Sequence, residues 1–192
     1  MRKRLAIVAA VLTAAVAGCG GGTGKGTGAA SPTTIPDPTP ASAHRISVTS
    51  TAYPDGGTIP TRYTCDGADV SPPLALAGVP GGTRSLAVVV RDLDTPGGAF
   101  THWLMWDIGT GTHRLSAGER PHGVREGRNS FGTDGYRGPC PPRGDHTHRY
   151  LLTVYAADRR PSLAPGATAD ALRRALTGHT LATGTLTGRY GR

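Results

Sequence analysis

The stretch SLAVVVR, Ser85 to Arg91, is rich in β-branched residues and almost wholly apolar. A run of this kind suits a β-strand that is buried on both faces, because no polar side chains alternate with the apolar ones. The sequence therefore predicts a strand at the centre of a sheet, with the other elements packed around it.

Two later segments also have the composition of strands. The first is FTHWLMWDI, Phe100 to Ile108, in which every second residue points to the same face of a strand. One face would carry His102, Leu104, Trp106 and Ile108. The second is RYLLTVYAA, Arg149 to Ala157. If its extended geometry begins one residue earlier, one face carries His148, Tyr150, Leu152 and Val154.

One segment near the C-terminus has the pattern of an amphipathic helix. Thr168 is a suitable N-cap for a helix over residues 169–177, and Gly178 is a suitable terminator. The apolar residues at helical spacing are Ala169, Leu172 and Leu176. Short strands separated by Pro/Gly turns, with one late helix, predict a mainly β sandwich.

The N-terminal residues predict export. The basic residues RKR (2–4) precede an apolar run (5–17) that is too short for the roughly 20 residues of a membrane-spanning helix. Residues 1–18 are therefore expected to be a signal peptide. The run ends in VAGC (16–19), which resembles the lipobox of bacterial lipoproteins, in which the cysteine carries lipid. The alternative is an ordinary signal peptide that is cut near Cys19.

The segment after the signal predicts a tether. Residues 19–43 are mostly Gly, Ser, Thr and Pro, and they have too few apolar side chains to offset the entropy cost of ordering. We expect this flexible tether to join a lipidated Cys19 to a single domain over residues 44–192. This organisation predicts a protein that is lipid-anchored on the extracytoplasmic face of the cell membrane.

The charge of the chain limits its partners. The sequence has 21 Lys+Arg and 13 Asp+Glu, a net charge of +8 with histidine neutral. Removing residues 1–18 takes away three basic residues, and leaves 18 against 13, a net charge of +5. The basic residues are scattered, with no basic stripe and no interleaved aromatic residues, which argues against nucleic-acid binding. We also expect no cofactor and no metal.

Polar clusters stand at the ends of the predicted strands. They are DLDTP (92–96), HW (102–103) and GPCPPRG (138–144), and the last is followed by His148 and Tyr150. Loops at the ends of sandwich strands commonly carry functional sites. Four other histidines show no partner pattern in the sequence: His113, His122, His146 and His179.

Five motifs, in order, resemble those of the phosphatidylethanolamine-binding protein family, also called Raf kinase inhibitor-like proteins. They are TCDGADVSPPL, DLDTP, HW, NSFGTDGYRGPCPPRG and HRYLLTVYAAD, and the similarity runs from about Ile46 to the C-terminus. The resemblance implies a Greek-key β sandwich of antiparallel sheets with one or two peripheral helices. It also implies a small surface pocket for phosphate-like or carboxylate anions and phospholipid head groups.

The resemblance also implies which residues form that pocket. The implied ligand-binding residues are Asp92, His102, Gly138, Cys140, His148 and Tyr150. The implied supporting residues are Asp94, Pro96, Pro141 and Pro142. Cys140 stands where the family pattern has a glycine, so it adds a side chain beside the ligand. Asp94 has a second interpretation, in which it holds the turn through its own backbone. The Gly-x-Gly-Pro-Pro pocket loop of the family corresponds to residues 138–142, and the segment NSFG (129–132) is interpreted as a turn that supports this pocket loop.

Physical chemistry gives each group a role in such a pocket. Prolines donate no hydrogen bond, so the N–H groups of Gly138 and Cys140 are expected to face the anion. His102 and His148 are expected to add donors whose charge rises as the pH falls. Asp92 would repel an anion, so we expect it to accept a hydrogen bond from a histidine, fix its tautomer and raise its pKa. The alternative is that GPCPPRG is only a rigid crossover between strands.

The cysteine count predicts one disulfide. With Cys19 assigned to lipid, Cys65 and Cys140 remain as an even pair in a compartment that permits disulfides, and we expect them to be bonded. The alternative is two buried free thiols.

Three classes of function fit these features. We favour a non-enzymatic binding protein whose pocket takes a small anion, a phospholipid head group or an anionic group of a partner protein that the sequence does not name. The alternative is a metal-assisted or acid–base hydrolase that uses Asp92, His102 and His148. Against it, the sequence has no Gly-x-Ser-x-Gly turn and no His-Glu-x-x-His helix. A structural envelope protein is the third class.

Overall fold

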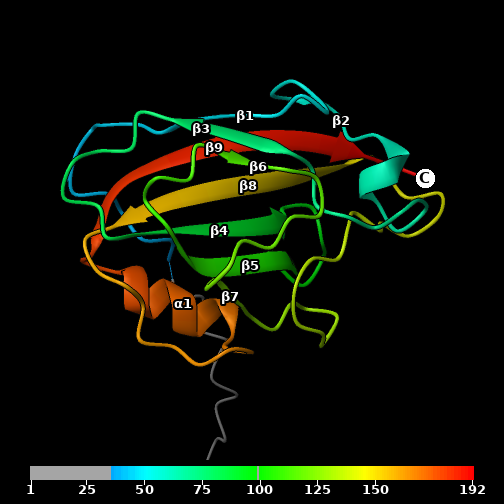
Figure 1. The fold of residues 1–192 in the computed structure, drawn as a ribbon. Coiled ribbons are helices and arrows are strands. Elements are labelled where there is room, and N and C mark those ends of the chain that lie inside the picture. Colours follow the sequence, from blue (N-terminus) through cyan, green and yellow to red (C-terminus); the bar gives the residue numbers. More distant parts are fainter. Residues whose placement is uncertain (1–35, 99) are drawn as a thin grey trace, which may run out of the picture. The chain divides into compact units, whose positions relative to one another are not determined.

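The described part of the chain folds into two β-sheets and one α-helix (Figure 1). The computed structural model describes residues 36–98 and 100–192, so the predicted signal peptide and Cys19 lie outside the described residues. The six-stranded sheet has the order β2-β9-β8-β4-β5-β7, and the three-stranded sheet has the order β1-β3-β6. The strands are β1 (Ser47–Thr49), β2 (Gly57–Thr58), β3 (Leu74–Ala77), β4 (Ser85–Asp92), β5 (Phe100–Ile108), β6 (Arg114–Leu115), β7 (Arg125–Glu126), β8 (His148–Ala157) and β9 (Thr180–Tyr190).

The strand order confirms the predicted topology. Strands β4, β5 and β7 are neighbours in sequence order within the large sheet, and β8 returns to lie beside β4, which is the Greek-key arrangement. These pairings are antiparallel, as expected. The short β2 departs from the expectation because it pairs with β9 in parallel.

Two apolar cores hold the layers together. The larger core lies between the sheets and includes Val48, Leu76, Val88 and Leu152, which come from strands of both sheets. The smaller core lies on the other face of the large sheet and joins it to the helix. Every residue of β4 is buried, with successive valines in different cores, so the prediction of a strand buried on both faces is confirmed.

The predicted helix is present as α1 (Ala169–Leu176). The Thr168 side chain accepts a hydrogen bond from the Ala171 N–H at 3.3 Å, which satisfies one of the N–H groups left free at a helix start. Leu172 and Leu176 are buried in the smaller core. Gly178 follows the helix with φ of +75°, a conformation that glycine adopts without strain.

Strand β5 departs from strict alternation at its end. Leu104 and Trp106 face the helix, whereas Ile108 lies in the core between the sheets. The predicted common face for these residues is therefore wrong at Ile108. The cause is Asp107, whose φ of +61° lies in the left-handed region and turns the next residue to the other face.

The domain begins earlier in the chain than the sequence indicates. Pro38 is buried, and the Asp37 carboxylate pairs with the guanidinium groups of Arg91 and Arg173, whose side chains are only 11% and 10% exposed. The Ala41 N–H also donates to the Thr180 carbonyl at 2.8 Å. The contacts of the domain therefore extend N-terminal to the boundary expected at residue 44, because an acidic residue of the proposed tether pairs with two cations of the domain.

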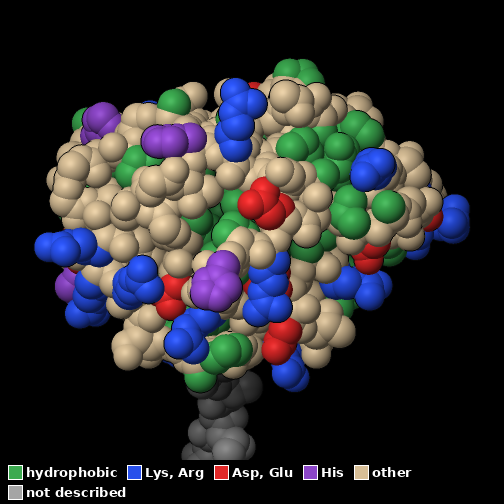
Figure 2. All heavy atoms as spheres, viewed as in Figure 1, with side chains coloured by type: hydrophobic (Ala, Val, Ile, Leu, Met, Phe, Trp, Pro, Cys, Tyr) green, Lys and Arg blue, Asp and Glu red, His purple; other side chains and the backbone are tan. Residues whose placement is uncertain are grey.

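The surface carries its charge in dispersed form. Both lysines of the chain lie outside the described residues, so the basic side chains drawn in Figure 2 are arginines. They are spread over the visible face, with acidic side chains among them. Within the described part of the chain, no helix combines the length and the apolar character that crossing a bilayer requires.

Candidate functional site

Two neighbouring strands bring Asp92 and His148 together. Strand β4 ends at Asp92 and β8 begins at His148, and the two strands pair with Asp92 opposite Tyr150. The His148 Nδ1–H donates to Asp92 Oδ2 at 2.7 Å, and the Asp94 N–H donates to Asp92 Oδ1 at 2.9 Å. Both side chains are almost fully buried, with 1% of His148 and 3% of Asp92 exposed. The expectation that Asp92 holds a histidine is confirmed.

The electrostatics at His148 also follow the expectation. Burial alone would lower the pKa of His148, but its hydrogen bond to Asp92 and the charges of Asp92 and Asp145 raise that pKa above the usual value. Asp92 therefore fixes the tautomer with Nδ1 protonated and leaves Nε2 to face the loop before β8.

A bulge directs His102 into the same region. Between β4 and β5, Val90 pairs with Trp103 and Arg91 pairs with Thr101, so His102 has no partner in the register. A bulge of this kind turns the extra side chain out of the regular alternation. The His102 ring lies against Tyr150, with 5.2 Å between ring centroids. The predicted alternation of His102 with Leu104 therefore fails at this point.

The tautomer of His102 leaves an acceptor, and not a donor, for a ligand. His102 Nδ1 lies 2.8 Å from the Arg137 carbonyl and 3.0 Å from the Gly138 carbonyl. Carbonyl oxygens only accept, so Nδ1 carries the proton and Nε2 carries a lone pair. Burial lowers the pKa of His102 below its usual value of 6.5. In its neutral form His102 therefore presents an acceptor at Nε2, whereas the sequence predicted a donor whose charge rises as the pH falls.

The Tyr150 ring lies near both histidines. Its ring centroid is 5.2 Å from that of His102 and 6.4 Å from that of His148. Its hydroxyl is buried and has no hydrogen-bond partner within the described part of the chain. Burial raises the pKa of Tyr150 far above its ordinary value, and the charge of Asp92 and the approach of its carboxylate to the hydroxyl, outside hydrogen-bond geometry, raise it further. The group is therefore a neutral hydroxyl that can donate to a ligand.

The pocket loop is held by contacts that the sequence did not predict. The Gly138 N–H donates to Asp69 Oδ1 at 2.6 Å, so it is not free to bind an anion, and that part of the prediction is wrong. A Cβ at Gly138 would lie 2.5 Å from the Tyr63 carbonyl oxygen and 2.7 Å from Thr64 Cα. Glycine is therefore needed for close packing of the loop against the segment around Thr64.

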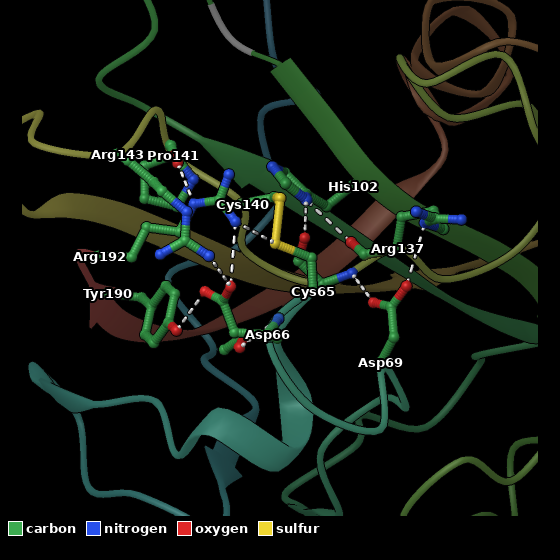
Figure 3. The surroundings of a disulfide bond; sticks show 12 residues. Cys65, Asp66, Asp69, His102, Arg137, Cys140, Pro141, Arg143, Tyr190 and Arg192 are labelled. Carbon is green, nitrogen blue, oxygen red and sulfur yellow. Dashed lines mark hydrogen bonds and ion pairs between the residues drawn. A yellow bond between two sulfur atoms is a disulfide. The ribbon is translucent and has the colours of Figure 1, made fainter.

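The predicted disulfide is present beside this contact (Figure 3). Cys65 and Cys140 are bonded across a sequence separation of 75, and the Cys65 N–H donates to the Pro139 carbonyl at 3.2 Å. The Cys140 side chain is therefore turned toward Cys65. The Cys140 N–H donates no hydrogen bond to any described residue. Of the two predicted backbone donors, Gly138 and Cys140, only the Cys140 N–H is therefore still available.

The last residue of the chain also holds the pocket loop (Figure 3). Arg192 Nε donates to the Pro141 carbonyl at 2.6 Å, and its Nη1 lies 3.0 Å from Asp66 Oδ1. The Tyr190 hydroxyl donates to the other oxygen of Asp66 at 2.8 Å. Pro141 is buried, whereas Pro142 and Pro96 are exposed.

Asp94 braces the two strands that carry the site. It accepts the Arg149 N–H at 2.7 Å and also pairs with the Arg149 guanidinium, 2.6 Å from Nη2. These hydrogen bonds lower the pKa of Asp94 to about 2. In the turn after β4 the Asp94 N–H donates to the Asp92 carboxylate, whereas the Asp94 side chain is bonded to Arg149.

Sequence reasoning missed two groups at the edge of the site. Asp145 Oδ2 lies 3.3 Å from His148 Nε2, and Asp145 Oδ1 lies 2.8 Å from His146 Nδ1. On the other side, Phe131 packs against His102 with 5.3 Å between ring centroids, and 41% of Phe131 is exposed. The segment DHTH (145–148) carried a signal for the first contact, because its acidic and histidine side chains lie close along the chain.

Comparisons with known proteins point to one family. The family model described as phosphatidylethanolamine-binding protein matches residues 49–191. A UPF0098 protein of Pyrococcus abyssi is 44% identical over 140 residues, which is 70% of this chain and 79% of that protein. The Mycobacterium tuberculosis protein named "Putative lipoprotein LppC" is 39% identical over 161 residues, 81% of this chain and 80% of its own length.

A solved structure has the same fold. The crystal structure of Escherichia coli YbcL, described as a new member of the mammalian PEBP family, superimposes with a TM-score of 0.72 at 31% sequence identity. The match covers 77% of this chain and 99% of YbcL. Sequence and fold lead to the same result: this chain belongs to the phosphatidylethanolamine-binding protein family.

Proposed function

We propose that the site around Tyr150 binds a small oxyanion, either a phosphate monoester or the head group of a phospholipid. The observation that carries this proposal is the buried Tyr150 hydroxyl, which has no partner within the described residues. A buried polar group without a partner is costly, so such a group in a native protein calls for an explanation. A ligand oxygen at this position would accept its hydrogen bond.

The surrounding groups support a ligand that also donates. The Cys140 N–H and the Tyr150 hydroxyl can donate, whereas the neutral His102 Nε2 accepts. A fully ionised phosphate offers only acceptors, but a monoprotonated phosphate ester has one O–H, and phosphoethanolamine has an ammonium group. The donor and acceptor set therefore favours these partly protonated ligands.

We further propose that the domain acts at a membrane surface through lipid on Cys19. The support is the VAGC sequence at residues 16–19, the apolar run before it, and the similarity to a mycobacterial protein named as a lipoprotein. An anchored domain would meet phospholipid head groups at high local concentration.

Binding explains Asp92 better than catalysis does. A general base needs a free oxygen within reach of a substrate proton, and both oxygens of Asp92 accept hydrogen bonds from the protein. In a binding site the same carboxylate orients His148. We therefore propose a non-enzymatic role in preference to the hydrolase.

The test is Tyr150→Phe, which removes only the hydroxyl. We expect the affinity for inorganic phosphate and for phosphoethanolamine to fall by about 1.5–3 kcal/mol, because a hydrogen bond to a charged ligand is lost. Stability should stay the same or rise, because the hydroxyl has no protein partner. Calorimetric titration measures the first quantity and urea unfolding the second, both in the presence of a chelator.

Tyr136→Phe is the matched control. The Tyr136 hydroxyl donates to the Tyr63 carbonyl at 2.7 Å, so its removal should lower stability by about 1 kcal/mol and leave ligand affinity unchanged. If Tyr150→Phe binds both ligands as tightly as the wild type, the proposed site is wrong. Binding of phosphoethanolamine without binding of phosphate would select the head group over the free ion.

A further inference from the structure

A second cluster of ligand-type groups lies on the segment that leads into β8. Asp145, His146 and His148 each offer one atom that metals bind, and these atoms all lie within 4.8 Å of one another. Asp145 and His146 are exposed, with 34% and 64% of their side chains accessible, whereas His148 is 1% exposed. One ligand is therefore fixed by burial, and the other two are free to adjust.

The contact between His148 and Asp145 needs a positive charge. His148 donates its Nδ1–H to Asp92, so in the neutral ring Nε2 carries only a lone pair. That lone pair faces the Asp145 carboxylate at 3.3 Å, and a carboxylate oxygen also only accepts. Two acceptors at this distance repel each other unless a proton or a metal ion lies between them.

The spacing fits a tetrahedral ion. Ligand atoms about 2.0–2.1 Å from a tetrahedral Zn²⁺ lie roughly 3.3 Å from each other. The distance from His148 Nε2 to Asp145 Oδ2 is 3.3 Å, so this pair is already at the separation that such an ion requires. The His146 ring lies 4.8 Å from the His148 ring between centroids, and its exposed side chain can rotate to complete the set.

The groups behind His148 are those of a metal-binding histidine. Histidine ligands usually donate the second ring N–H to a carboxylate, which fixes the tautomer and raises the basicity of the ligating nitrogen. Asp92 fills this position at 2.7 Å and is itself held by the Asp94 N–H at 2.9 Å. The buried hydrogen bonds therefore leave His148 Nε2 oriented before any ion arrives.

We propose that Asp145, His146 and His148 bind one divalent transition-metal ion, with Zn²⁺ as the best match. Two imidazoles and one carboxylate are ligands that suit zinc. Three protein ligands leave one tetrahedral position for water or an anion. This site differs from the set expected from the sequence, because Asp92 orients a ligand and His102 takes no part.

The test uses the full chain in detergent, stripped of metal by chelation and titrated with ZnCl₂ in a calorimeter. We expect one Zn²⁺ per chain for the wild type. Asp145→Asn and His146→Asn should each weaken binding by more than about tenfold, because loss of a hydrogen-bond partner behind a metal ligand already costs about 10–100-fold and here a ligand itself is lost. Both positions are exposed, so the fold should be retained, and circular dichroism checks this.

The matched control is His179→Asn. His179 Nδ1 lies 2.9 Å from Asp158 Oδ1, so it forms a similar exposed pair that belongs to no group of three among the described residues. Its substitution should leave the zinc affinity unchanged. Equal zinc binding in all variants, or an equal loss in His179→Asn, would show non-specific binding and overturn the proposal. A wild type that binds no zinc would also overturn the proposal, and a proton would then bridge His148 and Asp145.

A spectroscopic measurement keeps the test independent of the variants. Co²⁺ added to the metal-free wild type should give the strong visible absorption of a tetrahedral site, and Zn²⁺ should displace it. Weak absorption typical of six-coordinate Co²⁺ would contradict the proposed geometry, even if all variants failed to fold.

Discussion

At the scale of single residues, the site depends on which ring nitrogen of each histidine carries the proton. His148 donates to a carboxylate and His102 donates to two backbone carbonyls. The two rings therefore present similar free nitrogens but differ in charge behaviour, because Asp92 raises the pKa of His148 and burial lowers that of His102. Two histidines from different sequence motifs, which were expected to act alike, are thus two chemically different groups.

The lowered pKa of His102 predicts acid sensitivity. At pH 7 the residue is neutral in both the folded and the unfolded chain. As the pH falls below 6.5, the unfolded state takes up a proton first, so stability is lost by at most about 1.4 kcal/mol per pH unit until the folded pKa is reached. His102→Asn keeps a donor toward the Arg137 carbonyl but does not titrate.

Urea unfolding at pH 7, 6 and 5 measures this difference. The wild type should lose more stability than His102→Asn over this range, while all other groups titrate equally in the two proteins. Parallel curves for the two proteins would mean that the pKa of His102 is unchanged by folding. The measurement is made with a chelator present, so that metal binding does not contribute.

At the scale of elements, the sequence predicted the regular parts and missed the irregular ones. Local signals were sufficient to predict three elements, because each signal lies within the element itself. These signals are the apolar runs of β4 and β8 and the N-cap of α1. The bulge at His102 and the left-handed Asp107 depend on how β5 fits its neighbours, which no local pattern records. These two irregularities decide which side chains face the site.

The pocket loop shows the same limit. Its proline content indicated stiffness, and the cysteine count indicated the disulfide. The Asp69 carboxylate that takes the Gly138 N–H lies 69 residues away in the chain, so only the fold brings it there. A donor assigned to a ligand from sequence can therefore already be bonded within the protein.

The disulfide gives a prediction at this scale. Replacing Cys65 and Cys140 together by serine should lower the free energy of unfolding by up to roughly 4–5 kcal/mol, because the unfolded chain regains the freedom of a loop of 75 residues. Phosphate affinity should fall as well, since the Cys140 N–H is then less well positioned. Guanidinium unfolding with and without reductant, on a Cys19→Ala background, measures the effect.

The bond itself can be checked chemically. On the same background, denatured protein that has not been reduced should resist alkylation at both remaining cysteines. Full alkylation of both would contradict the disulfide and, with it, the predicted loss of stability.

At the scale of the whole molecule, the predicted lipid anchor can be tested separately from the domain. If Cys19 carries lipid, the full chain expressed in a bacterium that processes lipoproteins should fractionate with membranes after a carbonate wash, and Cys19→Ala should be released. Mass spectrometry of the N-terminal peptide should show the added acyl chains. Membrane association that persists in Cys19→Ala would exclude the cysteine as the anchor.

The pairing of Asp37 with Arg91 and Arg173 changes how far such an anchored domain can reach. Because contacts with the domain are observed from Asp37 onward, at most 17 residues lie between Cys19 and the domain, instead of the 24 that the boundary expected at residue 44 allows. At about 3.5 Å per residue, the greatest possible distance between a lipidated Cys19 and the domain shortens from ~85 Å to ~60 Å. The two ion pairs of Asp37 would thus set how far from the membrane surface a lipid-anchored domain can work.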